Sequence, residues 1–192
     1  MTNQNAILPA IALRGTTILP GMIVHFDVSR ERSKKAIEAA MLHDQKIFLV
    51  TQIDPEVENP DVSGVYRVGT IGYIKQVVKL PQDILRVLVE GTGRAVLEDF
   101  QQDFPYLTGV ISPVKEEETL LPDTVTEAMY RSLKELFHRY CMENGKISKE
   151  LVSQILNIES LEELIEQIAV NIPLSYQNKQ KILEALTLEE RY

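Results

Sequence analysis

The sequence is poor in cysteine and lacks long apolar runs, and each absence excludes a class of protein. Its 192 residues include one cysteine, Cys141, so an internal disulfide and a cysteine-rich zinc site are both excluded. No apolar run approaches the roughly 18 residues that a membrane span needs. The first five residues lack the basic start and apolar stretch of a signal peptide. We therefore expect a protein of the reducing cytoplasm.

Basic residues are also scarce relative to acidic ones. Twenty Lys and Arg stand against 28 Asp and Glu, which gives a net charge of −8. Long-range attraction to nucleic acid or to anionic membranes is therefore not the expected mode of action. Hydrophobic residues make up 44% of the chain and charged residues 25%, which is typical of folded globular proteins.

Composition changes near residue 115 and suggests a domain boundary. Residues 1–114 hold 11 basic and 13 acidic side chains, whereas residues 115–192 hold 9 and 15. Eight of the nine glycines and seven of the nine prolines lie in the first part. We therefore divide the chain into a β domain at 1–114, a charged linker at 115–122 and a helical subdomain at 123–192.

The first part has the pattern of an α+β domain. Residues 22–28 alternate between two faces, as in a half-buried strand, and the apolar residues of 33–41 recur at helical spacing. Further strands are expected at 47–50, 66–80, 84–90, 95–100 and 106–114, with turns at 81–83 and 91–93. Such short strands favour a curled sheet or partly closed barrel of about six strands, packed against one helix.

The second part has the pattern of a helical bundle. Apolar residues at helical spacing follow Asp123, Ser148, Ser160 and Ser175, each of which can cap a helix. Thr187 to Glu190 has the spacing of a further capping box two residues before the end of the chain. This start signal suggests a fragment of a longer protein, and the alternative is a frayed terminus.

No enzyme site is visible in the sequence. The tract Gly91-Thr92-Gly93-Arg94 lacks the spacing of a phosphate-binding loop. The three histidines are far apart and have no partners at metal-ligand spacing. We therefore expect no catalytic residue, no bound cofactor and no metal in this chain.

One loop is a candidate protein-binding surface. It contains Leu19, Pro20, Met22 and Ile23 beside the strand at 22–28. Core packing is the usual fate of such side chains, whereas exposure would mark a surface that binds protein substrates. Pro20 and the following glycine favour a turn that projects its neighbours, and methionine adapts to varied partners.

Five tracts together resemble a known family. They are LPAIALRGTTILPGMIVHFDVSRERSKKAIEAAM, KIFLVTQIDPEVENP, YRVGTIGYIKQVVKLP, LRVLVEGTGRAVLEDF and IPLSYQNKQKILEALTLEERY. Their order and spacing resemble the N-terminal domain of the Lon ATP-dependent proteases and the segment that joins it to the ATPase.

The resemblance implies a fold and a function. The fold is a PUA-like β-barrel followed by a helical bundle, and the function is recognition of unfolded or damaged proteins in a homo-hexameric, cytoplasmic serine protease of protein quality control and the stress response. ATP and Mg²⁺ are implied for the parent protein only, because this chain has no Walker motif and no serine-lysine site. The resemblance favours a fragment that is inactive alone. The alternative function is a free-standing PUA-like module for RNA or a small ligand, against which the acidic charge argues.

Overall fold

The computed structural model describes residues 5–115, 121–145 and 147–192. The chain divides into two compact units: a β unit of Met1–Lys115 with Ser175–Glu184, and a helical unit of Glu116–Leu174 with Ala185–Tyr192. Residues 175–184 thus belong to the β unit, whereas the sequence assigned all of 123–192 to a helical subdomain. Most of the expected linker at 115–122 lies outside the described residues.

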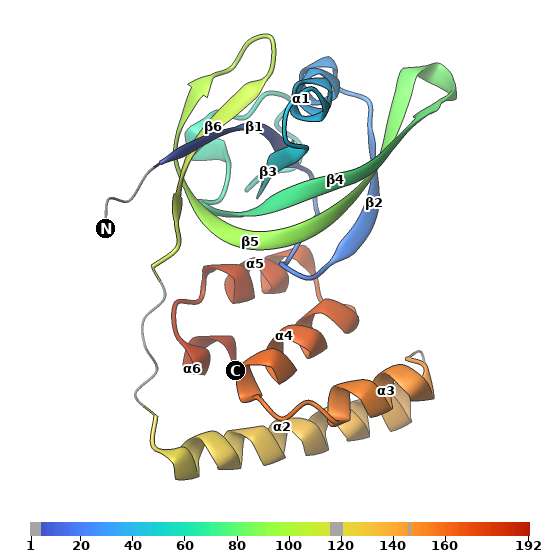
Figure 1. Cartoon of the computed structure of the whole chain (residues 1–192), viewed down its shortest axis with the longest axis vertical. Coiled ribbons are helices and arrows are strands. Elements are labelled where there is room, and N and C mark those ends of the chain that lie inside the picture. The colour runs from blue at the N-terminus through green and yellow to red at the C-terminus, as the bar shows by residue number, and fades with distance from the viewer. Residues whose placement is uncertain (1–4, 116–120, 146) are drawn as a thin grey trace. The chain divides into compact units, whose positions relative to one another are not determined.

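Six strands form one mixed, curled sheet in the β unit (Figure 1). They are β1 (Ala6–Leu13), β2 (Ile23–Val28), β3 (Lys46–Thr51), β4 (Val68–Leu80), β5 (Ile84–Gln102) and β6 (Leu107–Pro113). Their order is β2-β5-β4-β3-β1-β6, and an additional pairing of β5 with β6 closes the sheet. β1 and β3 are parallel, and the other pairs are antiparallel. The expected curled sheet with a packed helix is confirmed.

β5 is the strand that three others share. One of its edges pairs with β4 from Ile84 to Val96, while the other edge pairs first with β2 and then with β6. The predicted turn at 91–93 is wrong, because β5 continues through it with a shift of register against β4. A Cβ at Gly91 would lie 2.4 Å from the backbone oxygen of Leu19. Glycine is therefore needed where the loop before β2 approaches the strand.

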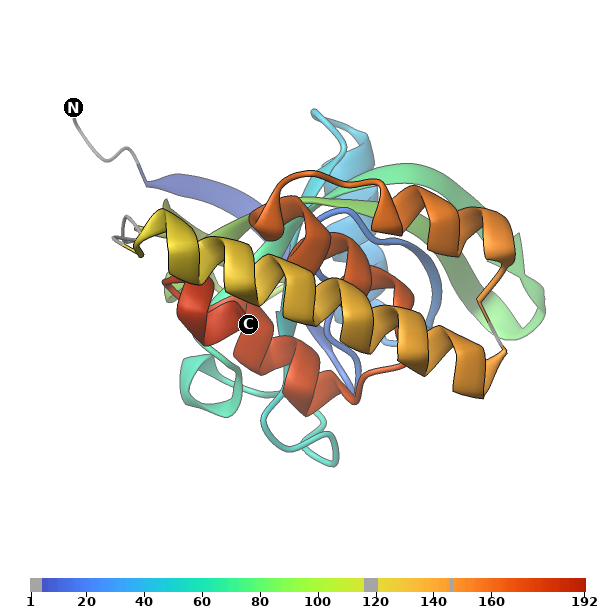
Figure 2. The same ribbon diagram turned by 90° about the horizontal axis from the view of Figure 1, so that it is seen from below.

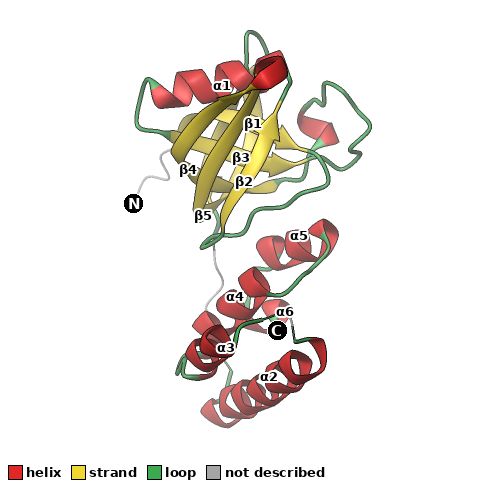
Figure 3. Cartoon of the chain, turned by 90° about the vertical axis from the view of Figure 1, so that its right-hand side faces the viewer, coloured by secondary structure: helices red, strands yellow, loops and turns green. Residues whose placement is uncertain are grey.

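The helix α1 (Glu31–Met41) lies across the sheet (Figure 3). Its buried residues include Ala36, Ile37 and Ala40, at the predicted helical spacing. Ser29 precedes the helix and could have capped it, but the helix begins after Arg30 and has no side-chain cap. Beneath it, the core of the sheet is built on the following buried residues: Ala10, Ala12, Phe48, Val50, Val65, Ala95, Leu97, Leu107 and Ile111.

A buried lysine ties α1 to the β4–β5 hairpin. The side chain of Lys34 is only 8% exposed, and its ammonium pairs with the carboxylates of Asp83 and Glu31. Asp83 belongs to the short 3₁₀ helix η2 (Pro81–Asp83) that turns the hairpin, and its φ is +56°. Lys34 is therefore a structural group of the β unit.

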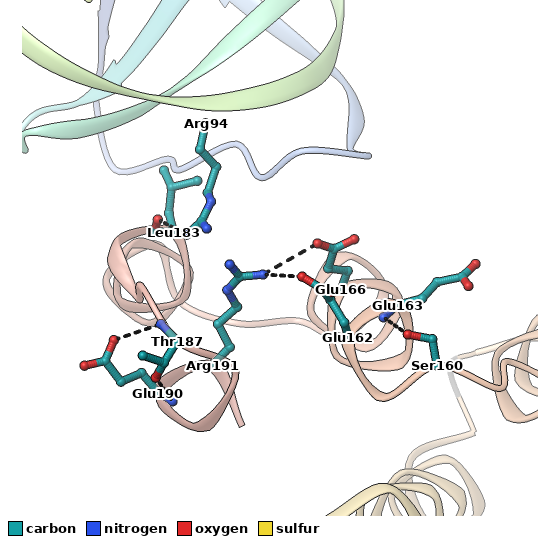
Figure 4. Close-up of polar contacts among 9 residues, drawn as sticks. All are labelled: Arg94, Ser160, Glu162, Glu163, Glu166, Leu183, Thr187, Glu190 and Arg191. Atoms are coloured by element: carbon teal, nitrogen blue, oxygen red, sulfur yellow. Dashed lines mark hydrogen bonds and ion pairs between the residues drawn. The ribbon is translucent and has the colours of Figure 1, made fainter. Parts of the chain in front are cut away.

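The helix α5 (Tyr176–Glu184) packs onto β4 through buried polar contacts. Gln180 is 1% exposed, and its amide nitrogen donates to the backbone carbonyl of Val68 at 2.9 Å. The Thr17 hydroxyl donates to the side-chain oxygen of Gln180 at 3.4 Å. Arg94 on β5 donates to the carbonyl of Leu183 at 3.0 Å (Figure 4). These contacts assign α5 to the β unit because they satisfy buried polar groups at both ends of the contact.

The helical unit contains α2 (Asp123–Asn144), α3 (Lys149–Leu156), α4 (Leu161–Asn171) and α6 (Leu188–Arg191). Figure 2 shows the long helix α2 crossing α4, and the two helices are in contact. Phe137, Ile155, Leu164 and Ile168 form the buried core. In the described part of the chain, no helix is both long enough and apolar enough to cross a lipid bilayer.

Most of the predicted helix ends of this unit are confirmed, but the cap at Asp123 is wrong, because Pro122 holds the N-cap position and Asp123 is the first residue of α2. Ser148 and Ser160 each accept a hydrogen bond from the backbone three residues later, and Gly145 ends α2 with a φ of +56°. Thr187 and Glu190 form the predicted capping box (Figure 4).

An arginine links the last helix to α4. The Arg191 guanidinium lies 3.4 Å from a carboxylate oxygen of Glu162 and 3.8 Å from one of Glu166 (Figure 4). This short helix is therefore tied into the helical unit.

Replacing Gln180 should destabilise the β unit. In Gln180→Ala the half-buried carbonyl of Val68 loses the hydrogen bond from a buried donor, and such losses cost about 1–3 kcal/mol. The matched control is Gln177→Ala, an exposed position of the same helix, which should change stability by less than about 0.5 kcal/mol. Urea denaturation measures both, and equal stability of the two variants would contradict the proposed role of Gln180.

The Lys34–Asp83 pair should make stability depend on pH. The hydrogen bond from Lys34 lowers the pKa of Asp83. Stabilisation by the pair is therefore fully present above the ordinary aspartate pKa of about 4 and is lost as the pH falls below it. We expect Asp83→Asn to be less stable than the parent at neutral pH, and the difference to shrink as the pH falls through the lowered pKa of Asp83. Asparagine tolerates positive φ, so the backbone is preserved.

The control for this experiment is Asp103→Asn, another exposed acid of the β unit. Thermal melts of the parent and both variants across the acid range measure the effect. A difference between parent and Asp83→Asn that persists unchanged at low pH would show that ionisation of Asp83 is not its source.

Candidate functional site

The structure separates the four residues of the predicted binding loop. Leu19 is 4% exposed and Met22 9%, so both are buried, while Pro20 is half-buried. Ile23, at 62% exposure, is the one large apolar side chain of the four that projects into solvent. Of the two alternatives for Leu19 and Met22, the structure shows core packing for both.

Backbone contacts explain why this loop folds inward. The N–H of Met22 donates to the carbonyl of Leu19 at 3.1 Å, which closes a tight turn. The N–H of Gly21 donates to the carbonyl of Gly91 at 2.9 Å, which fastens the turn to β5. The Lys179 ammonium of α5 approaches the Met22 sulfur at 4.0 Å, and burial lowers the pKa of this lysine.

Ile23 belongs to a larger exposed surface on three strands. In β2 the exposed residues Ile23, His25 and Asp27 alternate with residues that face the core. Directly opposite residues of antiparallel strands share one face. The strand registers thus define the outer sheet face, which consists of Ile23, His25, Asp27, Tyr73, Gln76, Val78, Arg86, Leu88 and Glu90.

Charges on the outer sheet face are paired with each other. The Arg86 guanidinium donates to both carboxylate oxygens of Asp27, at 2.7 and 2.8 Å. This hydrogen bonding lowers the pKa of Asp27 and raises that of Arg86. Beside this face, the Lys75 ammonium lies 2.5 Å from a carboxylate oxygen of Glu90. Because each charge has a partner, the face presents apolar contact and hydrogen bonding in place of a strong field of one sign.

Ile23 and Val78 supply the exposed apolar area of this face. Ile23 is 62% exposed and Val78 is 41% exposed, while Leu88, on the strand between β2 and β4, is half-buried. Apolar side chains flanked by paired charges are typical of surfaces that contact other proteins. The face can therefore bind apolar segments, and it contains no arrangement of nucleophile and base.

A second apolar surface lies within the helical unit. A groove of about 630 Å³ runs between α2 and α3 and is lined by Cys141, Met142, Ile147, Val152 and Leu156, among others. Met142 is 75% exposed. Burial raises the pKa of the Cys141 thiol, which disfavours the thiolate and hence nucleophilic reactivity at neutral pH.

Arg30, directly before α1, is held by structural contacts. Arg30 donates to the carbonyls of Ala12 and Glu58 and to the side-chain oxygen of Gln52. Its role as a clamp between β1, β3 and the following loop has no signature in the sequence. Among the described residues, no three His, Cys, Asp or Glu side chains are grouped so that they could hold a metal ion.

Comparisons with known proteins agree with the architecture. Residues 7–192 match the family described as the ATP-dependent protease La (LON) substrate-binding domain. The structure resembles the N-terminal domain of a Lon protease from the Mycobacterium avium complex, with a TM-score of 0.75 and 20% identity over 97% of this chain and 94% of that one. A Lon N-terminal domain protein from Xanthomonas campestris gives a TM-score of 0.65 at 16% identity, with the same coverage of both chains.

Full-length relatives extend well beyond this chain. A Lon protease of Lachnoclostridium phytofermentans is 43% identical over 192 residues, which are all of this chain and 24% of the relative. A Lon protease of Brevibacillus choshinensis is 40% identical over 96% of this chain and 23% of the relative. The chain therefore spans about a quarter of the length of these relatives. By the match of its residues 7–192 and by its fold, the chain belongs to the family of Lon protease N-terminal substrate-binding domains.

Proposed function

We propose that this chain binds unfolded or damaged protein substrates as the N-terminal part of an ATP-dependent Lon protease. The observation that carries the proposal is the family match over residues 7–192, whose description names substrate binding. The outer sheet face supports it, because Ile23 and Val78 expose apolar area that an unfolded chain can cover. We place the protein in the cytoplasm and in protein quality control.

The catalytic chemistry of the parent protease would lie outside these 192 residues. This chain spans 24% of the Lachnoclostridium relative, and we propose that the remainder supplies the ATPase, with ATP and Mg²⁺, and a serine-lysine protease site. The domain described here would then select substrates and support assembly of a homo-hexamer.

Weak capture by one copy fits such a role. Each exposed apolar side chain contributes about 1.5–3 kcal/mol when it is fully buried, whereas association costs roughly 4 kcal/mol or more. Two such anchors contribute about 3–6 kcal/mol in total, which is close to that cost, so one domain binds weakly. Six linked copies can raise the effective affinity by roughly 10² without any new contact.

Substitutions on the outer sheet face should weaken substrate binding without unfolding the protein. We expect Ile23→Ser with Val78→Ser to reduce affinity for a denatured model protein by about tenfold, as loss of partly buried apolar contact predicts. Both side chains are exposed, so the melting temperature should stay within about 2 °C.

The matched control replaces two exposed apolar residues elsewhere in the β unit. Leu42→Ser with Val62→Ser removes side chains that are 84% and 38% exposed. Fluorescence titration with a denatured, labelled protein measures both double variants. An equal loss in the two would mean that general surface hydrophobicity, and not the outer sheet face, binds the substrate.

The isolated chain should show no turnover. It has neither a phosphate-binding loop nor a serine-lysine nucleophile in its 192 residues. We expect purified protein to release no phosphate from ATP and no peptides from casein beyond a mock preparation. Activity that co-purifies with the chain through two orthogonal columns would refute this expectation.

A further inference from the structure

We propose that the free edge of β2 takes up an extended segment of the substrate polypeptide as an additional strand. This inference rests on the proposed function and specifies how the substrate is held. β2 pairs with β5 on one side and stands last in the strand order (Figure 1). Among the described strands, none pairs with its other side, which is a sheet edge.

The register identifies which backbone groups form this edge. The N–H of Gly91 donates to the carbonyl of the opposite residue, Met22, at 2.9 Å, which marks a hydrogen-bonded pair. Such pairs recur at every second residue of an antiparallel ladder, and the β2–β5 register contains no shift. Val24, Phe26 and Val28 therefore bond to β5. The N–H and C=O groups of Ile23, His25 and Asp27 point to the free edge.

These edge groups are available to a partner. Within the described ranges, the backbone of Ile23, His25 and Asp27 makes no hydrogen bond outside the β2–β5 ladder. The three side chains are exposed. Strand addition at such an edge gives affinity through main-chain hydrogen bonds. A protease domain that accepts many sequences gains from this mode, because every unfolded chain offers the same backbone groups.

The surroundings of the edge indicate the chemistry of the segment. Next to the carboxyl end of β2, a groove of about 180 Å³ is lined by the apolar residues Ile11, Leu13, Phe26 and Val28 and by Arg14 and Arg30. Side chains of an added strand alternate between this groove and the outer face. Apolar residues at alternate positions therefore suit the groove.

Charge at the end of the groove favours an acidic residue in the segment. Arg14 and Arg30 line the groove, where burial, and then the charges of Arg14 and Arg32, lowers the pKa of Arg30 against the opposing effect of the Glu58 carboxylate. The carboxylates of Asp27 and Glu31 already pair with Arg86 and Lys34, so Glu58 is the acid that offsets part of this charge. An acidic side chain at the end of the segment beside Arg14 would complement this positive charge.

Backbone methylation of a peptide tests strand addition directly. The parent probe is a labelled ten-residue peptide of alternating Val and Thr with an aspartate at each end. Two further peptides carry N-methyl groups on all Val or on all Thr residues. Backbone groups of alternate residues point to opposite edges. One methylated peptide should therefore bind roughly tenfold more weakly, as the loss of several hydrogen bonds predicts, and the other should bind like the parent.

Variants of the protein provide the second arm. His25→Pro removes an N–H that points to the free edge, where proline is tolerated because the ladder to β5 is untouched. His25→Ala removes the same side chain and keeps the N–H. Because both variants lack the imidazole, we expect the proline variant to bind the parent peptide roughly tenfold more weakly than the alanine variant. A thermal melt shows whether the proline variant is folded.

Each outcome decides the proposal. Equal binding of the two methylated peptides overturns strand addition even if His25→Pro does not fold. Equal binding by folded His25→Pro and His25→Ala overturns it as well. In both cases, retained binding of a denatured protein leaves the proposed function intact. If the native chain binds neither denatured protein nor the parent peptide, the proposed function fails and this inference fails with it.

Discussion

The architecture depends on one constraint, which is that β5 forms hydrogen bonds with three strands. Its nineteen residues pair with β4 on one edge and with β2 and then β6 on the other. A strand that serves two partners along one edge must curve, and register shifts on β5 provide the extra twist. The same division closes the sheet through β6 and leaves β2 with one free edge. Both the barrel and the proposed binding edge therefore follow from how β5 is shared.

Local pattern was sufficient for most elements and failed where pairing is non-local. The alternation in residues 22–28 and the serine caps of the helical unit were readable, because each depends on neighbours within one turn or strand. β1 was not predicted, since Ala6–Leu13 is apolar throughout and shows no alternation. Gly91-Thr92-Gly93 looked like a turn. It is a bulge, because β4 and the loop at Leu19 press against it from remote parts of the sequence.

The candidate site was also predictable only where it depends on local pattern. The period of two in β2 identifies Ile23 as outward-facing, whereas the burial of Met22 involves Lys179, which follows it by 157 residues. No local signal reports that contact. The free edge is equally invisible in the sequence, because an unpaired strand is defined by a neighbour that it lacks. Arg30 is the opposite case. A basic side chain, which usually lies in solvent, here donates to the carbonyl groups of Ala12 and Glu58.

Because α5 lies near the end of the chain, the β unit is completed late in synthesis. Gln180 contacts Val68 across 112 residues and Thr17 across 163, and contacts of such long range slow folding. Because a chain emerges from its amino end, the six strands are made well before the helix that packs on them. Until then the carbonyl of Val68 and the hydroxyl of Thr17 lack their partners on α5. A nascent chain at this stage is a species on which chaperones have time to act.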